Sequence, residues 1–477
     1  MSEQSESDLT RREFITASAA AAAALAVQLS PLAASAAGTE ESMKPRSPTT
    51  QSKNVKTITV RQNAGLTDAP IQQAIDELAA SGGGVVEVPA GLYLMHDALH
   101  LRTGVHVRGE KGTILRKAPS ITCLLRGGIG FAQADFAVQT PDVLRVGMGV
   151  LLTDKNGGGH YDTVGTIIAR QGDRFILSRP ARHDYNQDGQ ASVTSIFPLV
   201  EGFGVTDAGI ESVQLDGSEE TRTINGCVGG GIFLFDAQRI LAKGVEVSNW
   251  KGDSISIQKC VDVFIRACDV HHGTGIGLHP GTGTVRYVFD GNHLHDNQAT
   301  GLFFCMNTKF SLVRGNTIEN NGLLGIQVNE RDSDHWIEGN VIRNNGWAGI
   351  GFNVWEQRSG DRIQFQGNTL SGNCTKEGSA EILIRPAVRD IRIIDNKIEP
   401  TGKNKAMALV AQDCAEVYCA GNTVSGRAMG KDDVSGQPEL VKFAAPGAPL
   451  AVRPGDMPLD GALHLGVKDL AAFADRQ

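Results

Sequence analysis

The residues best suited to chemistry follow a series of Gly-Ile or Gly-Leu pairs in the middle of the sequence. One pair, Gly275-Ile276, leads into a short segment that is expected to be a β-strand, in which successive side chains point to opposite faces. If Ile276 and Leu278 point inward, His279 points outward, and the glycines around it leave open space. Because an imidazole titrates near neutral pH, His279 is the candidate general base.

The same register places further polar side chains on the outer face of neighbouring strands or in the turns after them. Glu330, Arg331 and Asp332 are the predicted catalytic partners of His279, because they bring carboxylates and a cation next to a base. The predicted binding residues add amides, a second cation, a carboxylate and an aromatic ring: Gln258, Lys259, Asn329, Asn353, Trp355 and Glu356. We expect one groove to hold them all. Arg331 and Asp332 could instead belong to a solvated turn, and Trp355 could pack within a loop.

Five of the twelve histidines fall between His271 and His295, which suggests a metal site. Register offers a simpler interpretation, because His271, His295 and Glu319 are expected to share one outward position on successive repeats. His272 is expected to share a turn position with four other polar residues: Asn249, Asp296, Asn320 and Asn344. Stacked His271 and His295 would suit a metal ion, but the pattern fixes no third ligand. A polar surface stack is therefore the favoured interpretation.

A repeat determines which elements must position these side chains. A Gly-Asn pattern, once Asp-Asn, recurs at Asn292, Asn316, Asn340, Asn368, Asn396 and Asn422, with spacings of 24, 24, 28, 28 and 26 residues. Such lengths favour a coil with three short strands per turn, whose strands stack about 4.8 Å apart in parallel sheets. Asparagine tolerates left-handed backbone geometry, and its side-chain amide is expected to hydrogen-bond to the asparagine one turn above. Cys268 occupies the slot one turn earlier, so the ladder should begin at Asn292.

An asparagine ladder followed by a Gly-Ile strand resembles the pectate-lyase-like superfamily of right-handed parallel β-helix proteins, of the polysaccharide lyase and glycoside hydrolase type. The segments Ala69–Asp76 and Gly82–Tyr93 resemble the N-terminal cap helix and first coil of its polysaccharide-active members. The resemblance covers roughly residues 56–425. It implies an all-β fold, a right-handed parallel β-helix of three-stranded coils, with the substrate groove on the Gly-Ile sheet.

The N-terminus predicts export. Arg11-Arg12 precedes an alanine-rich apolar run and the small-residue cleavage pattern Ala34-Ser35-Ala36, so residues 1–36 resemble a twin-arginine signal peptide. The run is too short and too rich in alanine for stable membrane insertion. Residues 37–55 are expected to be a disordered linker. The mature protein is then periplasmic or secreted by the twin-arginine route, and most of its eight cysteines should be buried thiols, because such proteins fold before export.

Two regions depart from the repeat. A β-rich insertion is expected at about residues 140–200, with strands over 143–150, 163–169 and 174–178. The repeat ends beyond Asn422, so residues 426–477 are expected to cap the coil and to include a short helix near Leu470.

The resemblance implies a polysaccharide substrate. The leading hypothesis is a lyase that cleaves an acidic, uronate-containing polymer by β-elimination, with His279 as base and Arg331 or Lys259 as the stabilising cation. A glycoside hydrolase would need a carboxylate pair drawn from Glu330, Asp332 and Glu356. A C5-epimerase and a non-catalytic carbohydrate-binding surface protein are also compatible with the same pattern.

Charge and composition restrict the partners. The net charge of −8 and the absence of a Lys/Arg-rich tract argue against nucleic acid, and a monomer is expected. No cofactor is certain. Ca²⁺ would bind only if oxygens of Glu330, Asp332 and Asp334 converge.

Overall fold

The computed structural model describes residues 55–62, 65–155, 159–186, 190–217, 222–353, 360–385, 388–400 and 407–447. The predicted signal peptide, nearly all of the predicted linker and the predicted helix near Leu470 lie outside the described residues. Within these ranges, no helix has the length and apolar character needed to cross a bilayer.

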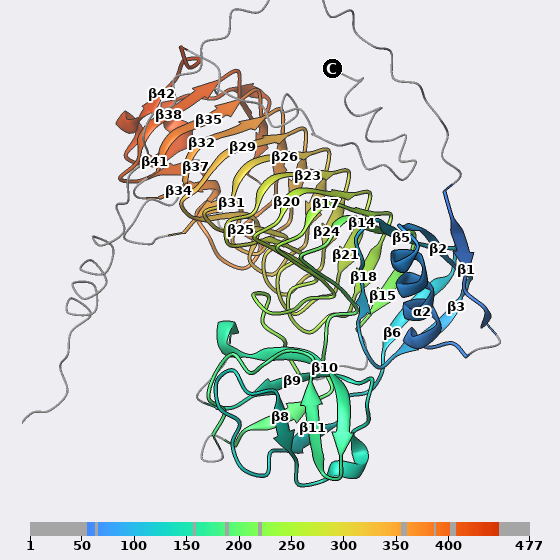
Figure 1. The fold of residues 1–477 in the computed structure, drawn as a ribbon. Helices are drawn as coiled ribbons and strands as arrows, with labels where there is room; N and C mark the ends of the chain where they lie inside the picture. The colour runs from blue at the N-terminus through green and yellow to red at the C-terminus, as the bar shows by residue number, and fades with distance from the viewer. Residues whose placement is uncertain are drawn as a thin grey trace, which may run out of the picture. The chain divides into compact units, whose positions relative to one another are not determined.

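The predicted cap helix is present as α2 (Asp68–Ala80). Thr67 is its N-cap residue, and its apolar positions repeat at helical spacing, so that one face is buried: Ile71, Ala74, Ile75 and Leu78. These side chains join the large hydrophobic core that runs through the coil. Helix α2 therefore closes the first turn of the coil, as Figure 1 shows beside β2 (Gly84–Val88).

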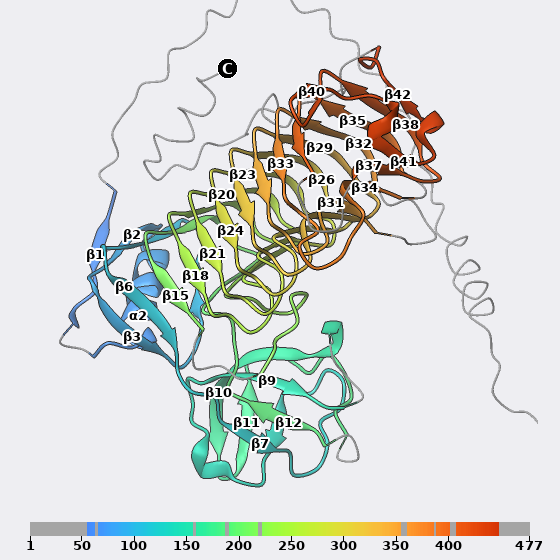
Figure 2. The same ribbon diagram turned by 180° about the vertical axis from the view of Figure 1, so that it is seen from behind.

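Three parallel sheets run along the coil, which confirms the predicted β-helix (Figures 1 and 2). The first sheet carries neither the Gly-Ile nor the Gly-Asn strands. In the described part of the chain it has 13 strands: β1 (Thr57–Thr59), β2, β5 (Val105–Gly109), β14 (Thr206–Glu211), β17 (Gln238–Lys243), β20 (Val261–Arg266), β23 (Val285–Asp290), β26 (Lys309–Arg314), β29 (Asp332–Glu338), β32 (Gly360–Gln366), β35 (Arg389–Ile394), β38 (Ala415–Ala420) and β42 (Val441–Lys442).

The Gly-Ile sheet has 11 described strands: β4 (Leu99–His100), β13 (Val200–Phe203), β16 (Ile232–Phe235), β19 (Ile255–Gln258), β22 (Leu278–Pro280), β25 (Leu302–Met306), β28 (Leu324–Glu330), β31 (Ala348–Phe352), β34 (Ala380–Ile384), β37 (Met407–Ala411) and β41 (Val434–Gly436).

The Gly-Asn sheet has 12 described strands: β3 (Gly91–Met95), β6 (Thr113–Lys117), β15 (Gln214–Asp216), β18 (Glu246–Ser248), β21 (Asp269–His271), β24 (His293–His295), β27 (Thr317–Glu319), β30 (Val341–Arg343), β33 (Thr369–Ser371), β36 (Lys397–Glu399), β39 (Thr423–Val424) and β40 (Arg427–Ala428). Figure 2 shows this sheet from outside the coil.

The asparagine ladder forms at the corner before the Gly-Asn sheet and begins at Asn292, as predicted. Asn292 Nδ2 donates to Asn316 Oδ1 at 2.9 Å, and the same bond links each later pair up to Asn422. The ladder asparagines do not use the left-handed conformation that their residue type tolerates. The residue before each one takes that conformation, as at Gly291 with φ 65° and Asp395 with φ 54°. Glycine has no Cβ to clash in this conformation, so the turn forms without backbone strain. The side chain of the following asparagine can then point into the coil.

A second ladder, absent from the sequence-based prediction, links Asn297, Asn321, Asn345 and Asn373. It ends on Glu381, whose carboxylate accepts from Asn373 Nδ2 at 2.5 Å and from Asn373 N at 3.1 Å. Burial raises the pKa of this Glu381 carboxyl to about 7.

Replacement of Asn340 by alanine is expected to lower the free energy of unfolding by roughly 3 kcal/mol, because it leaves several buried polar groups without partners. Asn340 Oδ1 accepts from both the backbone and the side chain of Asn316, and its Nδ2 donates to Val313 O and to Asn368 Oδ1. Thermal unfolding measures the effect. The matched control is Asn344→Gly, at an exposed turn position with φ 57° that glycine adopts freely. Equal melting temperatures for the two variants would contradict the role of the ladder.

The insertion is a six-stranded antiparallel sheet in the order β7 (Thr122–Leu124), β12 (Ser192–Thr194), β9 (Gly149–Thr153), β10 (Thr163–Gln171), β11 (Arg174–Leu177) and β8 (Asp135–Ala137). It has its own hydrophobic core. The sheet starts before residue 140, and the strand expected over 143–150 is wrong: residues 141–143 form a short 3-10 helix, η2 (Pro141–Val143), and β9 starts only at Gly149.

The coil also continues beyond residue 425. Strand β41 pairs in parallel with β37, and β42 pairs in parallel with β38. Short 3-10 helices, η5 (Lys431–Asp433) and η6 (Pro438–Leu440), connect these last strands. The described part of the C-terminal segment therefore extends the sheets rather than only covering their end.

Candidate functional site

His279 lies on the outer face of the Gly-Ile sheet, as predicted, although the repeat is aligned differently there. Leu278 pairs with Ile255 and Leu302, so Gly277-Leu278 is the true member of the repeat rather than Gly275-Ile276. Side chains alternate with a period of two, so this shift of two residues keeps His279 outward. Ile276 was expected in the core, but because of this shift it lies in the wall of a pocket instead.

Asp253, which the repeat pattern did not reveal, orients the imidazole. Its Oδ2 lies 2.7 Å from His279 Nδ1, and its Oδ1 accepts from the backbone N of Ile276 at 2.9 Å. A carboxylate only accepts, so Nδ1 carries a proton and the lone pair of the neutral ring lies on Nε2. Among the described residues, this buried Nε2 has no hydrogen-bond partner. The pair therefore holds a base whose reactive nitrogen is not engaged by the protein.

A pocket of about 430 Å³ surrounds this pair. The segment 223–227 forms one wall and the strands of the Gly-Ile sheet form the floor, with Phe303 and Cys305 beside His279. The His279 and Phe303 rings lie 5.4 Å apart between centroids. Burial raises the pKa of the Cys227 thiol to about 11 and that of the Cys305 thiol to about 12, so both are neutral rather than nucleophilic thiolates. The cysteines of the described chain are all free, and six are buried, as expected.

The loop over His279 is fastened to the sheet beneath it. Ser256 Oγ donates to Gly226 O at 2.5 Å, and Gln258 Nε2 donates to Ser256 Oγ at 3.0 Å. Two residues before Gly226, Ile224 N also donates to Lys251 O at 3.1 Å. Gln258, predicted to bind substrate, is only 3% exposed and supports this loop instead.

Three other predicted binding residues, Lys259, Asn329 and Asn353, lie outside the lining of this pocket. Lys259 is exposed, and its ammonium lies 5.1 Å from the centre of the Phe235 ring. Asn353 Nδ2 donates to Asn329 Oδ1 at 2.9 Å, and Gln327 Nε2 donates to Asn353 Oδ1 at 2.7 Å, which forms a row of amides further along the coil. Trp355 and Glu356 lie outside the described residues.

The predicted Glu330-Arg331-Asp332 group does not join His279. Arg331 and Asp332 line a different pocket of about 270 Å³, which shares no lining residue with the His279 pocket. Asp332 is 0% exposed, so the expectation of a groove carboxylate is wrong. It starts β29 and accepts from Thr308 N at 2.8 Å and Asn329 N at 3.0 Å, which holds two turns together. Burial raises its pKa to about 7.

Two of the three carboxylates proposed for Ca²⁺ are paired with cationic side chains, and the third, Asp332, accepts backbone hydrogen bonds. Glu330 pairs with Arg331 at 3.1 Å, and Asp334 accepts from Arg362 at 2.7 Å. Among the described residues, Glu330, Asp332 and Asp334 do not form a group that could surround one ion.

An ion cluster at the start of the Gly-Ile sheet joins the insertion to the coil. His100 Nδ1 lies 2.7 Å from Glu201 Oε1, and Arg179 of the insertion donates to the same oxygen at 2.5 Å. Asp97 Oδ2 and Thr166 Oγ1 lie 3.1 Å and 3.3 Å from His100 Nε2. Burial acts to lower the pKa of His100, but hydrogen bonds and charges of Asp97 and Glu201 outweigh it and raise the pKa to about 9.

Stability is expected to fall in alkaline solution as His100 loses its proton. The folded pKa of about 9 exceeds the ordinary value of 6.5, so the stabilisation is fully present below pH 6.5 and is lost as pH rises through 9. The loss amounts to about 3 kcal/mol, at 1.36 kcal/mol for each pKa unit. Melting temperatures of the wild type and of His100→Gln should converge as pH rises. A difference independent of pH would contradict a charged His100.

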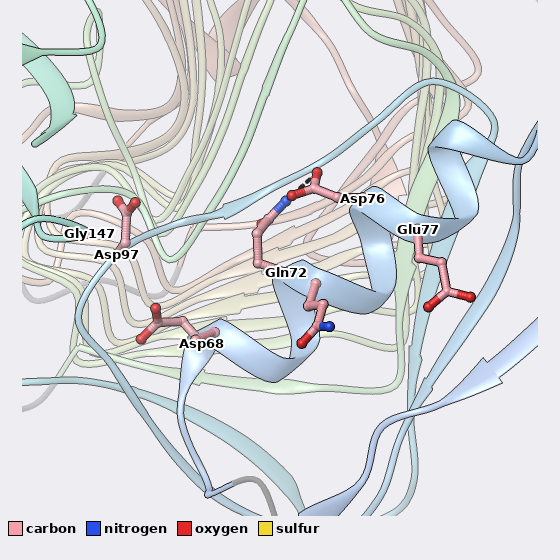
Figure 3. A pocket seen from close by; sticks show the side chains of 8 residues that line it. Asp68, Gln72, Asp76, Glu77, Asp97 and Gly147 are labelled. Atoms are coloured by element: carbon pink, nitrogen blue, oxygen red, sulfur yellow. Dashed lines mark hydrogen bonds between the residues drawn. The ribbon is translucent and has the colours of Figure 1, made fainter. Parts of the chain in front are cut away.

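A wider hollow of about 640 Å³ lies along α2, but its carboxylates are already engaged (Figure 3). Asp68 Oδ1 accepts from His96 N at 2.8 Å, and Asp76 Oδ1 accepts from Gln72 Nε2 at 3.1 Å and pairs with Arg102 at 2.9 Å. Glu77 and Asp97 are paired as well, with Lys56 at 3.8 Å and with His100 at 3.1 Å. The smaller His279 pocket is therefore the candidate active site.

Two parts of the site were not expected from the sequence. Asp253 lies in the short connection 249–254 before β19, and no feature of the repeat distinguishes it. The covering segment belongs to the long connection between β15 and β16, and length was the signal that could have found it: residues 217–231 separate these strands, whereas the next coil needs only 249–254.

Comparison with known proteins agrees with the coil. Residues 213–424 match the family described as right handed beta helix region. The A-module of the Azotobacter vinelandii mannuronan C-5 epimerase AlgE6 is 16% identical, with a TM-score of 0.50 over 80% of this chain and 92% of that chain. The AlgE4 A-module of the same organism is 16% identical with a TM-score of 0.48, over 80% and 94% of the two chains.

A surface adhesin of Streptococcus pneumoniae, PfbA, is 11% identical with a TM-score of 0.43, over 77% of this chain and 89% of that chain. No curated protein matches the sequence. At these identities the likeness shows the fold alone.

Proposed function

We propose that the protein is an exported enzyme that removes the proton next to the carboxylate of a uronate-containing polysaccharide. The observation that carries this proposal is the buried His279 Nε2, which has no partner among the described residues while Asp253 holds Nδ1. A positioned base of this kind is what abstraction of a carbon-bound proton requires. The twin-arginine pattern supports export of the folded chain to the polymer.

Elimination is the reaction that the pocket supports best. His279 Nε2 takes the C5 proton, the electron pair forms the C4–C5 double bond, and the C4–O4 bond breaks. The leaving oxygen then receives a proton, from the imidazolium or from water. The charge that builds on the uronate carboxylate needs a cation. None of the described residues that line the pocket is an arginine or a lysine. Arg182 of the insertion is the candidate from outside this lining, because its charge lowers the pKa of the Cys227 thiol against the larger effect of burial.

A C5-epimerase is the second candidate. It shares the proton abstraction, but it returns a proton to the opposite face of C5 and leaves the chain intact. The neutral thiols of Cys227 and Cys305 line the same pocket as His279 and supply protons for that step. A glycoside hydrolase has less support, because it needs a carboxylate pair. Asp253 is the one carboxylate among the described residues that line the pocket, and it is bound to His279.

One incubation separates these reactions. The purified chain is incubated in D₂O with a panel of uronate polymers, while ultraviolet absorbance and the proton NMR spectrum are followed. A lyase produces unsaturated ends and rising absorbance. An epimerase exchanges H5 for deuterium without chain cleavage. If neither signal appears with any polymer, the proposal of proton abstraction is wrong and a binding role takes its place.

A further inference from the structure

A second cluster of ionisable groups lies on the outer face of the Gly-Asn sheet, away from the His279 pocket. Asp269 of β21 pairs directly with His293 of β24, and His295 lies two residues further along β24 on the same face. His295 Nε2 lies 3.0 Å from Asp269 Oδ1, and His293 Nδ1 lies 3.6 Å from the same oxygen. The three side chains each bring one ligand atom within 4.8 Å of the other two.

These separations match a metal coordination shell. Bonds of about 2.1 Å to a tetrahedral ion place neighbouring ligand atoms about 3.4 Å apart. The two nitrogen–oxygen separations bracket this value. The His293 and His295 rings stack with centroids 3.9 Å apart, so these partly exposed side chains must rotate to bring both nitrogens onto one ion. The two strands that carry the three residues, β21 and β24, are hydrogen-bonded in register, which holds the backbone of the site in place.

The opposite nitrogen of each imidazole is held by a carboxylate. His293 Nε2 lies 2.8 Å from Glu319 Oε1, and His295 Nδ1 lies 2.6 Å from Asp296 Oδ2. A carboxylate that receives the N–H of one ring nitrogen leaves the lone pair of the other nitrogen free to bind a metal. Metal-binding histidines in proteins nearly always have such a partner, which fixes their tautomer and their orientation. A metal ion bound here takes the place of the hydrogen through which His295 Nε2 contacts Asp269 Oδ1 at 3.0 Å, while Glu319 and Asp296 keep the opposite ring nitrogens protonated.

We propose that Asp269, His293 and His295 bind one divalent transition-metal ion, with Glu319 and Asp296 orienting the two imidazoles. Two nitrogen ligands and one oxygen ligand favour Zn²⁺, Co²⁺ or Ni²⁺ over Ca²⁺, which prefers oxygen alone. Three protein ligands leave at least one position for water. The site involves neither His279 nor Asp253.

The sequence alone favoured a polar stack of His271 and His295, and these rings do stack, with centroids 4.8 Å apart. The register places Glu319 in the same row as His271 and His295, as predicted. His271 is not one of the proposed ligands. Two of the three ligands, Asp269 and His293, belong to the neighbouring row of the same face. The site becomes visible only when both rows are placed side by side.

Titration with Co²⁺ tests the site. The full chain, without a purification tag and after treatment with a chelator, is titrated while visible absorption and heat are measured, and Zn²⁺ is then added as a competitor. We expect about one Co²⁺ per chain and at least a 10-fold loss of affinity in His293→Gln, His295→Gln and Asp269→Asn, the lower limit of the effect typical of metal-site changes.

Two control variants keep the result interpretable. His160→Gln removes an exposed histidine of the insertion, and His279→Gln removes the proposed base; both should bind Co²⁺ as the wild type does. Unchanged melting temperatures without metal confirm that the variants fold. The site is wrong if the wild type binds no Co²⁺ at millimolar concentration, or if the three variants bind it as tightly as His160→Gln. These outcomes do not depend on whether the chain acts on a polymer.

Discussion

Replacement of His279 by glutamine is expected to reduce turnover of the uronate polymer roughly 10³-fold, within the range typical of general bases. Glutamine retains a donor for Asp253 Oδ2, which His279 Nδ1 approaches to 2.7 Å, but it has no basic nitrogen at the position of Nε2. The substitution therefore removes the proton acceptor and preserves the local hydrogen bond. Initial rates at saturating polymer, by absorbance for elimination or by H5 exchange for epimerisation, measure the effect.

The matched control is His160→Gln, which changes an exposed histidine of the insertion and should leave turnover unchanged. Thermal unfolding should give similar melting temperatures for both variants, which excludes loss of fold as the cause. If His279→Gln keeps turnover within a factor of about three of the wild type, His279 is not the base. The pocket would then need another proton acceptor.

Replacement of Asp253 by asparagine is expected to lower kcat by roughly 10²-fold to 10³-fold with little change in KM. The oxygen of the introduced amide still accepts the Ile276 N–H, as Asp253 Oδ1 does, so the backbone of the pocket wall is retained. The amide nitrogen also donates toward His279 Nδ1, which favours the tautomer with the proton on Nε2 and removes the lone pair from the pocket. A positioning residue acts in this way on kcat, because it alters the transition state and not the binding of the polymer.

Replacement of Gly226 by alanine tests the same geometry without removing any polar group. A Cβ at Gly226 would lie 1.8 Å from Asp253 Oδ2 and 2.8 Å from His279 Nδ1, so the pair must shift. The matched control is Gly283→Ser, at a glycine with no heavy atom near its Cβ position, although its φ of 70° adds modest backbone strain. A fall in kcat for Asp253→Asn and Gly226→Ala, with Gly283→Ser close to the wild type, is the expected pattern. A change confined to KM in Asp253→Asn would assign Asp253 to polymer binding instead.

The outer position of His279 followed from the sequence even though the repeat is aligned two residues away from the predicted pair at this coil. The error was harmless because strand side chains alternate with a period of two. The same reasoning failed for Asp332. The sequence predicted that Glu330, Arg331 and Asp332 lie in the turn after the strand and face the groove, but β28 extends to Glu330 and β29 starts at Asp332, so only Arg331 remains in the turn. Strand length at a corner depends on the coils above and below, which no single repeat specifies.

The coil, its corner ladder and the outward position of His279 could be predicted from the sequence. These properties are local or repeat at a fixed spacing, so glycine, asparagine and apolar positions encode them directly. The polar residues that meet one another became apparent only in the folded chain. Asp253 reaches His279 across adjacent coils, a loop from outside the repeat closes their pocket, and Asp269 joins histidines of the next strand. Such contacts depend on how separate rows stack and on the course of irregular connections. The repeated sequence pattern encodes neither.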